Sequence, residues 1–177
     1  MKILLISPFF SPDVGGVETM LSNFCNFLTS QKYTVVVITY NPLIVKEKAK
    51  FREKIKSADG ILFAVNEHNY SVSSVLKNVI EWGSRPYAAA VMNKKPVAMF
   101  SASNGMLGGA RAQYHLRQIC VQVDMYPLNK PEVIITFAQD KFDQKGNLTD
   151  VHTQEKLKEL IDAFIPWVKN SRRAGGL

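Results

Sequence analysis

The sequence predicts an α/β protein in which helices cover both faces of a parallel sheet, a three-layer α/β/α sandwich. Strand patterns and helix patterns alternate from one end of the 177-residue chain to the other, as they do in βαβ units. The strand patterns are short and mostly apolar, as in strands that are buried on both faces. There is no internal repeat and no low-complexity linker, so we expect one domain that spans residues 1–177.

Five segments have a strand pattern, and apolar side chains at helical spacing follow each of them. The expected strands are residues 2–6, 34–39, 61–65, 96–102 and 132–137, and the expected helices include 17–28, 46–58, 72–80, 110–123 and 157–168. Ser71 is expected to cap the third helix. Pro166 is expected to kink the last helix or to end it early, because proline lacks an amide hydrogen.

The net charge of +7 raises the question of nucleic-acid binding. The excess of lysine and arginine lies mainly in residues 46–56 and 169–173, and neither segment interleaves aromatic with basic residues as a strand-binding groove does. In the first segment Phe51, Ile55 and Ala58 recur at helical spacing, so its lysines form the solvent face of a helix. We expect no nucleic-acid partner.

Cysteine content and hydropathy exclude other classes. Cys25 and Cys120 are the only cysteines, and each lies in an apolar helical pattern, so we expect two core residues rather than a disulfide or a metal site. The chain has no run of 18 apolar residues, and Pro8 and Pro12 follow the first strand too soon for a signal peptide. We expect a cytoplasmic protein without a membrane span.

The stretch from residue 66 to residue 86, NEHNYSVSSVLKNVIEWGSRP, is the most informative of the chain. It joins a polar turn at the end of the third expected strand to an amphipathic helix. Open α/β sheets bind ligands outside the carboxyl ends of their strands, so this turn is a candidate binding loop. The stretch closely resembles the PEYNYS and LKNAIDW segments of the NAD(P)H-dependent FMN reductases, the flavodoxin-like family that includes chromate and quinone reductases.

Later segments extend this resemblance, which is nearly continuous from residue 54 to residue 169. GGARAQYHLRQ at 108–118 and NKPEV at 129–133 resemble the chromate and quinone reductase branch, and GNLTD precedes the last expected helix. The resemblance implies a flavodoxin-like, five-stranded parallel sheet of order 2-1-3-4-5. The loops after strands one, three and four would then share one rim.

The resemblance also implies that FMN binds in these loops. Asn66, Glu67, His68 and Asn69 stand where the family usually has Pro-Glu-Tyr-Asn, and they are expected to line the isoalloxazine ring. Asn69 can donate and accept hydrogen bonds, and the flat imidazole of His68 can replace an aromatic ring. A lone histidine is more often a surface or core residue than a catalyst, so we do not expect His68 to be an acid.

The fourth loop, SNGMLGG at 103–109, is rich in glycine. Glycine lets the backbone approach a ligand closely, although a tight strand-to-helix turn needs glycine as well. In the resembled family, the serine that matches Ser103 lies against the flavin. The expected FMN contacts from this loop are Ser103, Asn104, Gly105 and Gly108.

The first loop departs from the family pattern. FMN reductases carry GSxRxxSxN there, so that hydroxyls, a guanidinium and helix amides hold the FMN phosphate. Residues 7–18 contain no arginine or lysine, and Asp13 and Glu18 add negative charge. The phosphate contacts that this loop can still offer are Ser7, Ser11, Gly15 and Gly16.

Residues 1–42 instead resemble the opening βαβ unit of glycosyltransferases that are built from two Rossmann-like domains, whose first strand is followed by a PDVGGVE loop. The two resemblances together predict a hybrid chain, recombined or engineered. In it, the unit at residues 1–42 is joined to an FMN-reductase-like segment at residues 46–170. Glycosyltransfer itself is not expected, because that chemistry needs a second domain to bind the nucleotide-sugar donor.

The resemblance implies an FMN-dependent NAD(P)H oxidoreductase. Hydride would pass from the nicotinamide to flavin N5 and on to a quinone, free flavin, chromate or a similar acceptor. The cofactor carries this chemistry, so no catalytic side chain is expected. Two alternatives stay open: a flavodoxin-like hybrid that has lost FMN and acts only as a structural or binding module, and a binder of nucleotides or nucleotide-sugars through the first loop.

A homodimer, or a dimer of dimers, is the expected assembly. Arg111, Tyr114 and Glu132 match positions near subunit contacts in the resembled reductases, and Trp82 lies on the third expected helix. Aromatic and arginine side chains anchor interfaces, and two-fold assemblies are the commonest. The local alternative is that Trp82 covers its own sheet and Arg111 pairs with a nearby carboxylate.

Overall fold

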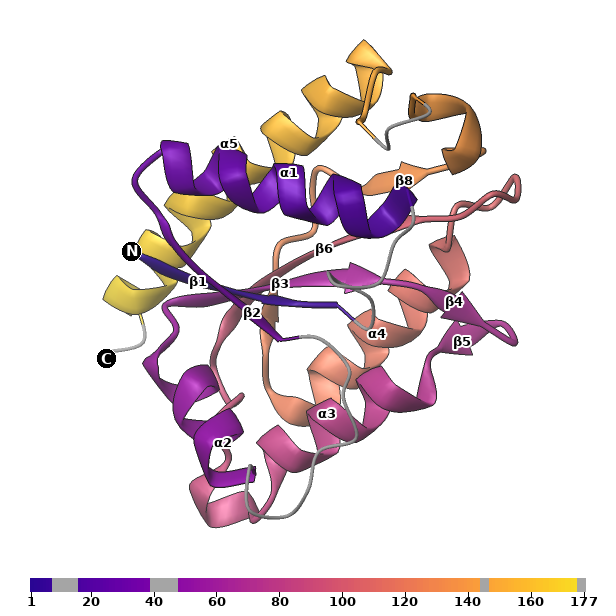
Figure 1. The fold of residues 1–177 in the computed structure, drawn as a ribbon. Helices are drawn as coiled ribbons and strands as arrows, with labels where there is room; N and C mark the ends of the chain where they lie inside the picture. The colour runs from indigo at the N-terminus through magenta and orange to yellow at the C-terminus, as the bar shows by residue number, and fades with distance from the viewer. Residues whose placement is uncertain (8–15, 39–47, 144–146, 175–177) are drawn as a thin grey trace.

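Helices lie on both faces of a parallel sheet in the computed structural model of the chain, which describes residues 1–7, 16–38, 48–143 and 147–174 (Figure 1). The strand order is β2-β1-β3-β6-β7, and β8 also pairs with β6. All pairings within this sheet are parallel. The predicted flavodoxin-like α/β/α sandwich with order 2-1-3-4-5 is therefore confirmed.

The first four strands in the order of the sheet agree with the sequence patterns. They are β2 Thr34–Ile38, β1 Lys2–Ile6, β3 Gly60–Val65 and β6 Pro96–Ala102. Every residue of β3 is buried, as expected for a strand that helices cover on both sides.

The fifth position of the sheet consists of two short strands. β7, Tyr126–Pro127, pairs with the start of β6, and β8, Val133–Ile135, pairs with its end. The expectation that this strand runs to Phe137 is wrong. Phe137 has φ 47° and precedes the short 3-10 helix Ala138–Lys141, so its backbone is left-handed rather than extended.

In the described part of the chain, five α-helices cover the sheet. They are α1 Gly16–Ser30, α2 Lys48–Ser57, α3 Ser74–Ser84, α4 Ala110–Val123 and α5 Val151–Ala174. A short 3-10 helix, Tyr87–Ala89, follows α3. Helices α1 and α5 lie on one face, and α2, α3 and α4 lie on the other (Figure 1).

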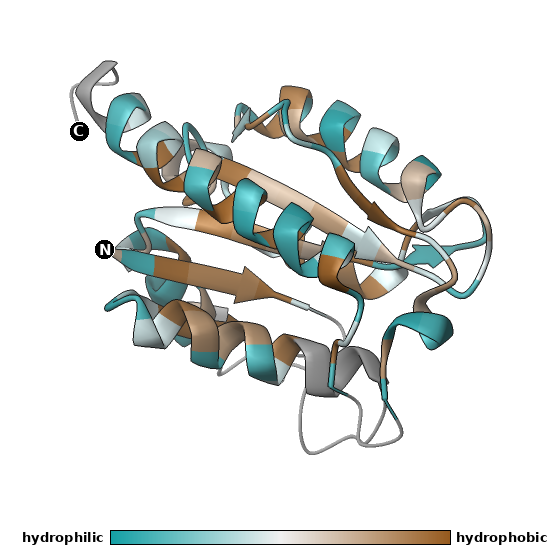
Figure 2. Cartoon of the chain, turned by 90° about the horizontal axis from the view of Figure 1, so that it is seen from above, coloured by the Kyte–Doolittle hydropathy of each residue, from teal (hydrophilic) through white to brown (hydrophobic). Residues whose placement is uncertain are grey.

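Each face has its own hydrophobic core. Leu21 and Leu28 of α1 and Phe164 of α5 pack on one side, and Ile55 of α2 and Leu116 of α4 pack on the other. Figure 2 shows the apolar strands between helices whose outer faces are hydrophilic. The apolar stripes read from the sequence are thus the faces that the helices bury.

The predicted cap of the third helix is wrong by two residues. Ser73, not Ser71, is the cap, and its hydroxyl accepts a hydrogen bond from the amide of Leu76 at 3.2 Å. Ser71 instead belongs to β5, Ser71–Val72, which pairs antiparallel with β4, Glu67–His68. Ser73 and Ser74 are also possible caps in the sequence. The pattern did not predict the hairpin that lies between the strand and the helix.

The early end predicted for the last helix is also wrong. α5 continues through Pro166 to Ala174. Ile165 and Val168, on either side of the proline, are buried against the sheet. This packing offsets the loss of one backbone hydrogen bond.

Within the described residues, no helix is long and apolar enough to cross a membrane. The same part of the chain contains no group of three or more histidine, cysteine, aspartate or glutamate side chains that could hold a metal ion.

Candidate functional site

The loop after β3 is a small β-hairpin at the carboxyl edge of the sheet (Figure 1). Glu67 pairs with Val72 and His68 with Ser71, and the two turn residues between them, Asn69 and Tyr70, have φ 47° and 71°. Two-residue hairpin turns require positive φ at such positions, and asparagine tolerates it well. Asn69 therefore has a conformational role besides the polar one predicted for it.

The hairpin separates the predicted site residues into two groups. His68, Asn69 and Tyr70 at its tip are exposed, and Asn66 and Glu67 at its base are half-buried. A cavity of about 450 Å³ lies beside the tip, with His68 and Asn69 among the residues that line it.

Helix α4 holds the base of the hairpin. Arg111 donates from Nε to Oε1 of Glu67 at 2.6 Å, and its terminal nitrogen forms an ion pair with the same oxygen. The guanidinium carbon of Arg111 also lies 3.6 Å from the centroid of the Tyr70 ring. The hydrogen bond with Glu67 is the main cause that raises the pKa of Arg111 above its ordinary value.

A second contact joins the same two elements. Nδ1 of His115, on α4, lies 3.0 Å from the hydroxyl of Ser71 in β5. The hairpin is thus attached to α4 through both of its strands.

Several polar atoms at the base of the hairpin are buried without a hydrogen-bond partner among the described residues. They are both side-chain polar atoms of Asn66 and Oε2 of Glu67. An unsatisfied buried polar group costs roughly 1–3 kcal/mol, and native structures hold few of them. These atoms comprise one donor group and two acceptors, whose hydrogen bonds a polar ligand that reached them would supply.

The fourth loop, residues 103–109, is fixed by its backbone. The amide of Ser103 donates to the carbonyl of Ile135, and the carbonyl of Ser103 accepts from the amide of Ala138, each at 3.0 Å. The Ser103 hydroxyl accepts from the amide of Gly105 at 3.1 Å. Asn104 and Gly105 are exposed at the end of this loop.

The glycines of the fourth loop have different roles. Gly108 and Gly109 have φ 55° and 87°, and a Cβ on them would lie 2.7 Å from Ile134 Cγ2 and 2.8 Å from Ser101 Cβ. The fold itself therefore requires these two glycines. A Cβ on Gly105 would meet only the Ser103 hydroxyl, at 3.6 Å, so Gly105 leaves open space at the rim.

Gln113 is a site residue that the sequence analysis did not find. Its side chain is 1% exposed, and its amide nitrogen donates to the Ser101 hydroxyl and to the Val133 carbonyl, each at 2.8 Å. It therefore joins α4 to β6 and β8 directly beneath the fourth loop. A glutamine next to the apolar positions Ala112 and Leu116 of the helix was the available signal.

Two of the four predicted first-loop contacts lie outside the described residues. Ser11 and Gly15 are among residues 8–15, and Gly16 is the first residue of α1. Ser7 is buried at the end of β1, where its amide donates to the carbonyl of Ile38 at 3.0 Å.

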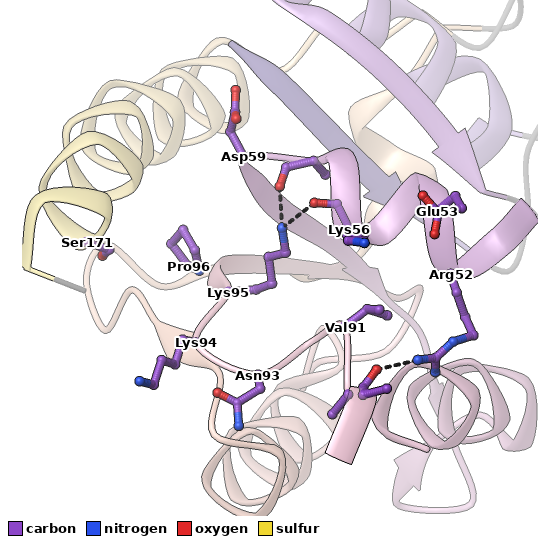
Figure 3. Close-up of a pocket in the computed structure, with 13 residues that line it drawn as sticks. Arg52, Glu53, Lys56, Asp59, Val91, Asn93, Lys94, Lys95, Pro96 and Ser171 are labelled. Atoms are coloured by element: carbon purple, nitrogen blue, oxygen red, sulfur yellow. Dashed lines mark hydrogen bonds between the residues drawn. The ribbon is translucent and has the colours of Figure 1, made fainter. Parts of the chain in front are cut away.

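A larger cavity, of about 570 Å³, lies at the opposite, amino edge of the sheet (Figure 3). Four basic side chains line it, and backbone carbonyls engage two of them, Arg52 and Lys95. Arg52 donates to the carbonyl of Trp82 at 2.9 Å, and Lys95 donates to the carbonyl of Ala58 at 2.6 Å. These two cations therefore hold the ends of α2 and α3 in place, and their donors are not free to bind an anion.

The two cysteines are core residues, as predicted. Burial raises the pKa of Cys25 to about 11 and that of Cys120 to about 12. Both thiols are therefore protonated near neutral pH, and neither is an activated nucleophile.

The strand order, the hairpin and the glycine loop together define a flavodoxin-like α/β protein with its candidate site at the carboxyl edge. A solved structure of a flavoenzyme NAD(P)H:(acceptor) oxidoreductase from Paracoccus denitrificans is similar over 96% of this chain and 98% of its own, with a TM-score of 0.80 and 23% identity. An archaeal flavodoxin covers 97% of this chain and 99% of its own, with a TM-score of 0.60 and 14% identity. At these identities the likeness shows the fold.

Sequence comparison then shows the family. The family model for NADPH-dependent FMN reductase matches residues 19–140, and the chain belongs to this family, as the sequence predicted. The match begins inside the 1–42 segment for which a glycosyltransferase-like unit was predicted, and that resemblance stays a prediction.

Curated relatives agree with this assignment. An NAD(P)H-dependent FMN reductase from Pseudomonas aeruginosa is 49% identical over 123 residues, which are 70% of this chain and 66% of that protein. An NADPH:quinone oxidoreductase from Arabidopsis thaliana is 47% identical over 125 residues, 70% of this chain and 60% of that protein. The matches thus span slightly less than two thirds of these two relatives.

Proposed function

We propose that this protein is an FMN-dependent NAD(P)H oxidoreductase that reduces a quinone or a similar small acceptor. The observation that carries the proposal is the set of unpartnered polar atoms on Asn66 and Glu67, at the carboxyl edge of a chain in the FMN reductase family. The names of the relatives, among them a 2-hydroxy-1,4-benzoquinone reductase from Burkholderia sp that is 37% identical over 122 residues, support a quinone as the acceptor.

The residues at the rim fit a flavin. The isoalloxazine ring is flat, and its polar edge carries both acceptors and an N–H donor, so it needs a mixed edge on the protein. The Asn66 amide can donate and accept, and Oε2 of Glu67 can accept. Residues Ser103, Asn104, Gly105 and Gly108 of the fourth loop and the exposed His68 and Asn69 complete the proposed ring contacts.

When bound, FMN supplies the redox chemistry, and the protein supplies binding and orientation. The hairpin and the fourth loop hold donors and acceptors at fixed positions, which orients a flat ligand. The exposed tip of the fourth loop leaves room for a second flat molecule. No side chain is needed as a nucleophile, which agrees with the protonated state of both thiols.

We further propose that the first loop holds the phosphate through Ser7, Ser11, Gly15 and Gly16. Asp13 opposes a phosphate in this loop, so Asp13→Arg is expected to tighten FMN binding, because a guanidinium adds charge-assisted hydrogen bonds. An unchanged dissociation constant would place the phosphate elsewhere.

The organisation of the chain is also a proposal. Residues 1–177 form one domain, in which a glycosyltransferase-like unit at 1–42 joins an FMN-reductase-like segment at 46–170, and the protein is cytoplasmic. Both units are βαβ modules, and β1 pairs with both β2 and β3 in the parallel sheet, which supports their integration in one sheet.

A homodimer remains the proposed assembly, although two of its predicted anchors have local contacts. Arg111 pairs with Glu67, and Trp82 lies edge-on to Phe51 with ring centroids 6.5 Å apart. The exposed rings of Tyr87 and Tyr114 support an interface. Light scattering that gives a monomer of 19.9 kDa at micromolar concentration would contradict the dimer.

The decisive experiment is FMN binding followed by turnover. We expect the purified protein to take up FMN, to absorb near 450 nm after removal of free cofactor, and to oxidise NADPH when a quinone is present. FMN at a hundredfold excess over its dissociation constant should stabilise the fold by about 2.7 kcal/mol.

Asn66→Ala is the matched variant for this experiment, because it removes the unpartnered amide and leaves the hairpin contacts of Arg111 in place. It should bind FMN more weakly without any loss of stability, because the atoms that it removes are buried and unsatisfied. A colourless wild-type protein without NADPH oxidation would refute the proposed function, and a thermal shift with uridine or guanosine nucleotide-sugars would favour the nucleotide binder instead.

A further inference from the structure

We propose that Arg111 is a positioning residue for the candidate site: it holds the β4–β5 hairpin against α4, so that Asn66 and the second oxygen of Glu67 face a ligand in a conformation set in advance. The inference rests on the proposed function, because the ligand in question is FMN. It assigns to Arg111 a role within its own chain, where the sequence analysis had expected a subunit contact.

The hairpin cannot hold its own shape. Each of its strands has two residues, and only two residue pairs join them. An isolated two-stranded hairpin is marginally stable in water even when it is longer. The conformation of residues 66–72 must therefore come from contacts with the rest of the molecule.

The turn of this hairpin also stores strain. Tyr70 has φ 71°, and a left-handed backbone is unfavourable for a residue with a side chain. The ring of Tyr70 is 67% exposed, so burial in the core does not offset that cost. The guanidinium of Arg111 packs on this ring instead, with its carbon 3.6 Å from the ring centroid.

Arg111 contacts only one of the two carboxylate oxygens of Glu67. Both contacting nitrogens of Arg111 reach the same oxygen, Oε1. The other oxygen, Oε2, stays buried and has no hydrogen-bond partner among the described residues, as do both polar atoms of the adjacent Asn66. Arg111 thus fixes the direction of the carboxylate and leaves the hydrogen-bonding capacity of its other, buried oxygen unused.

The helix that carries Arg111 is a rigid support. Arg111 is in the first turn of α4, and two residues later Gln113 joins this helix to β6 and β8 through hydrogen bonds of 2.8 Å. A small strained hairpin is therefore attached to a helix that is itself fixed to the sheet. Groups held in place before binding lower the entropic cost of binding.

Lysine could not replace arginine fully in this position. The planar guanidinium of Arg111 forms a hydrogen bond and an ion pair with one carboxylate oxygen while it lies over a tyrosine ring, whereas an ammonium is a point charge on a flexible stem. Arg111→Lys should therefore restore the charge and only part of the positioning. Arg111→Met should remove both and keep a side chain of similar length.

The test combines a ligand-free and a ligand-dependent measurement on the full chain. The variants are Arg111→Met and Arg111→Lys, with Lys158→Met as the control, because Lys158 forms an exposed ion pair with Asp162 on α5. Hydrogen exchange of residues 66–73 without FMN reports the hairpin. Fluorescence titration gives the FMN dissociation constant, and light scattering gives the mass of each variant.

We expect Arg111→Met to speed exchange in residues 66–73 only and to weaken FMN binding about tenfold, the equivalent of one charge-assisted hydrogen bond. The FMN affinity of Arg111→Lys should lie between those of Arg111→Met and the wild type. When the FMN concentration is varied in turnover, Arg111→Met should raise the KM for FMN more than it lowers kcat. Lys158→Met should match the wild type in all measurements.

The inference is overturned if Arg111→Met exchanges and binds FMN as the wild type does, and the proposed function would survive that result. It is also overturned if Arg111→Met changes the mass of the assembly while exchange in the hairpin stays the same, because Arg111 would then act between subunits. If the wild type binds no FMN, the proposed function fails, and the exchange measurement still decides whether Arg111 holds the hairpin. If Arg111→Met does not fold, Arg111→Lys decides by the same two measurements.

Discussion

The two edges of the sheet differ in whether their polar side chains have hydrogen-bond partners. The amino edge has the larger cavity, about 570 Å³, but its Arg52 and Lys95 are occupied by backbone carbonyls (Figure 3). The carboxyl edge has a cavity of about 450 Å³ beside the tip of its hairpin. At the base of the same hairpin, the polar atoms of Asn66 and one oxygen of Glu67 have no partner among the described residues. Unmet hydrogen-bonding capacity, and not cavity volume, marks the candidate site.

A change in the fourth loop should have the largest effect on the carboxyl edge. Gly109→Ala places a Cβ 2.8 Å from Ser101 Cβ at φ 87°, so we expect a loss of about 3 kcal/mol in the free energy of unfolding and weaker FMN binding. Urea denaturation of the apoprotein measures the first effect. Gly105→Ala is the matched control, because its Cβ meets only Ser103 Oγ at 3.6 Å. Equal stability of the two variants would contradict the close approach of Gly109 to Ser101 and its left-handed backbone.

The next effect concerns the support beneath that loop. Gln113→Leu leaves the Ser101 hydroxyl and the Val133 carbonyl without their buried donor, which should cost about 2 kcal/mol of stability and weaken FMN binding. Gln118→Leu, at an exposed position of the same helix, should change stability by less than about 0.5 kcal/mol. If both variants behave alike, Gln113 does not support the site.

A change at the amino edge should affect stability alone. Arg52→Met removes the donors to the carbonyls of Trp82, Arg85 and Ala89, and we expect it to lower the free energy of unfolding by about 1–2 kcal/mol. The FMN dissociation constant should stay the same. Lys54→Met, at an exposed position on α2, is the control for loss of one charge. Weaker FMN binding by Arg52→Met would contradict the expectation that the amino edge contributes to stability and not to FMN binding.

The smallest effect is a pH dependence at the start of α5. Hydrogen bonds from Thr153, and then Lys141, lower the pKa of Asp150 from 3.8 to about 2. A carboxyl group with a depressed pKa stabilises the fold above its unfolded pKa and loses this contribution as the pH falls through the folded value. The wild type should therefore lose more thermal stability than Asp150→Asn between about pH 4 and pH 2, measured by calorimetry without cofactor. Parallel pH profiles would refute the ion-pairing role of Asp150.

Local pattern was enough to place most of the framework. The strands at 2–6 and 96–102 and the buried stripe that includes Phe51 and Ile55 were predicted because a buried face repeats with the period of its element. The third and fourth loops were predicted as the site because the carboxyl ends of parallel strands meet at one edge. These inferences need only neighbours in the sequence and the general geometry of a parallel sheet.

Errors occurred where a distant contact decided the local structure. The fifth strand is divided because β6 pairs with Tyr126–Pro127 at its start and with Val133–Ile135 at its end. Ser73 caps α3 because the preceding residues form a hairpin that packs against α4. α5 continues past Pro166 because its flanking apolar residues pack against the sheet.

The sequence by itself determined the fold class, the strand order and the loops at the candidate site, because periodicity and family resemblance are both written in consecutive residues. Only the tertiary structure joined Arg111 to Glu67 across 44 residues and placed Gln113 between Ser101 and Val133. The partner of each of these side chains is set by the packing of elements that are far apart in the chain. The periodicity of consecutive residues does not predict that packing. For this protein, the sequence located the rim, and the fold decided which of its polar atoms are free to bind.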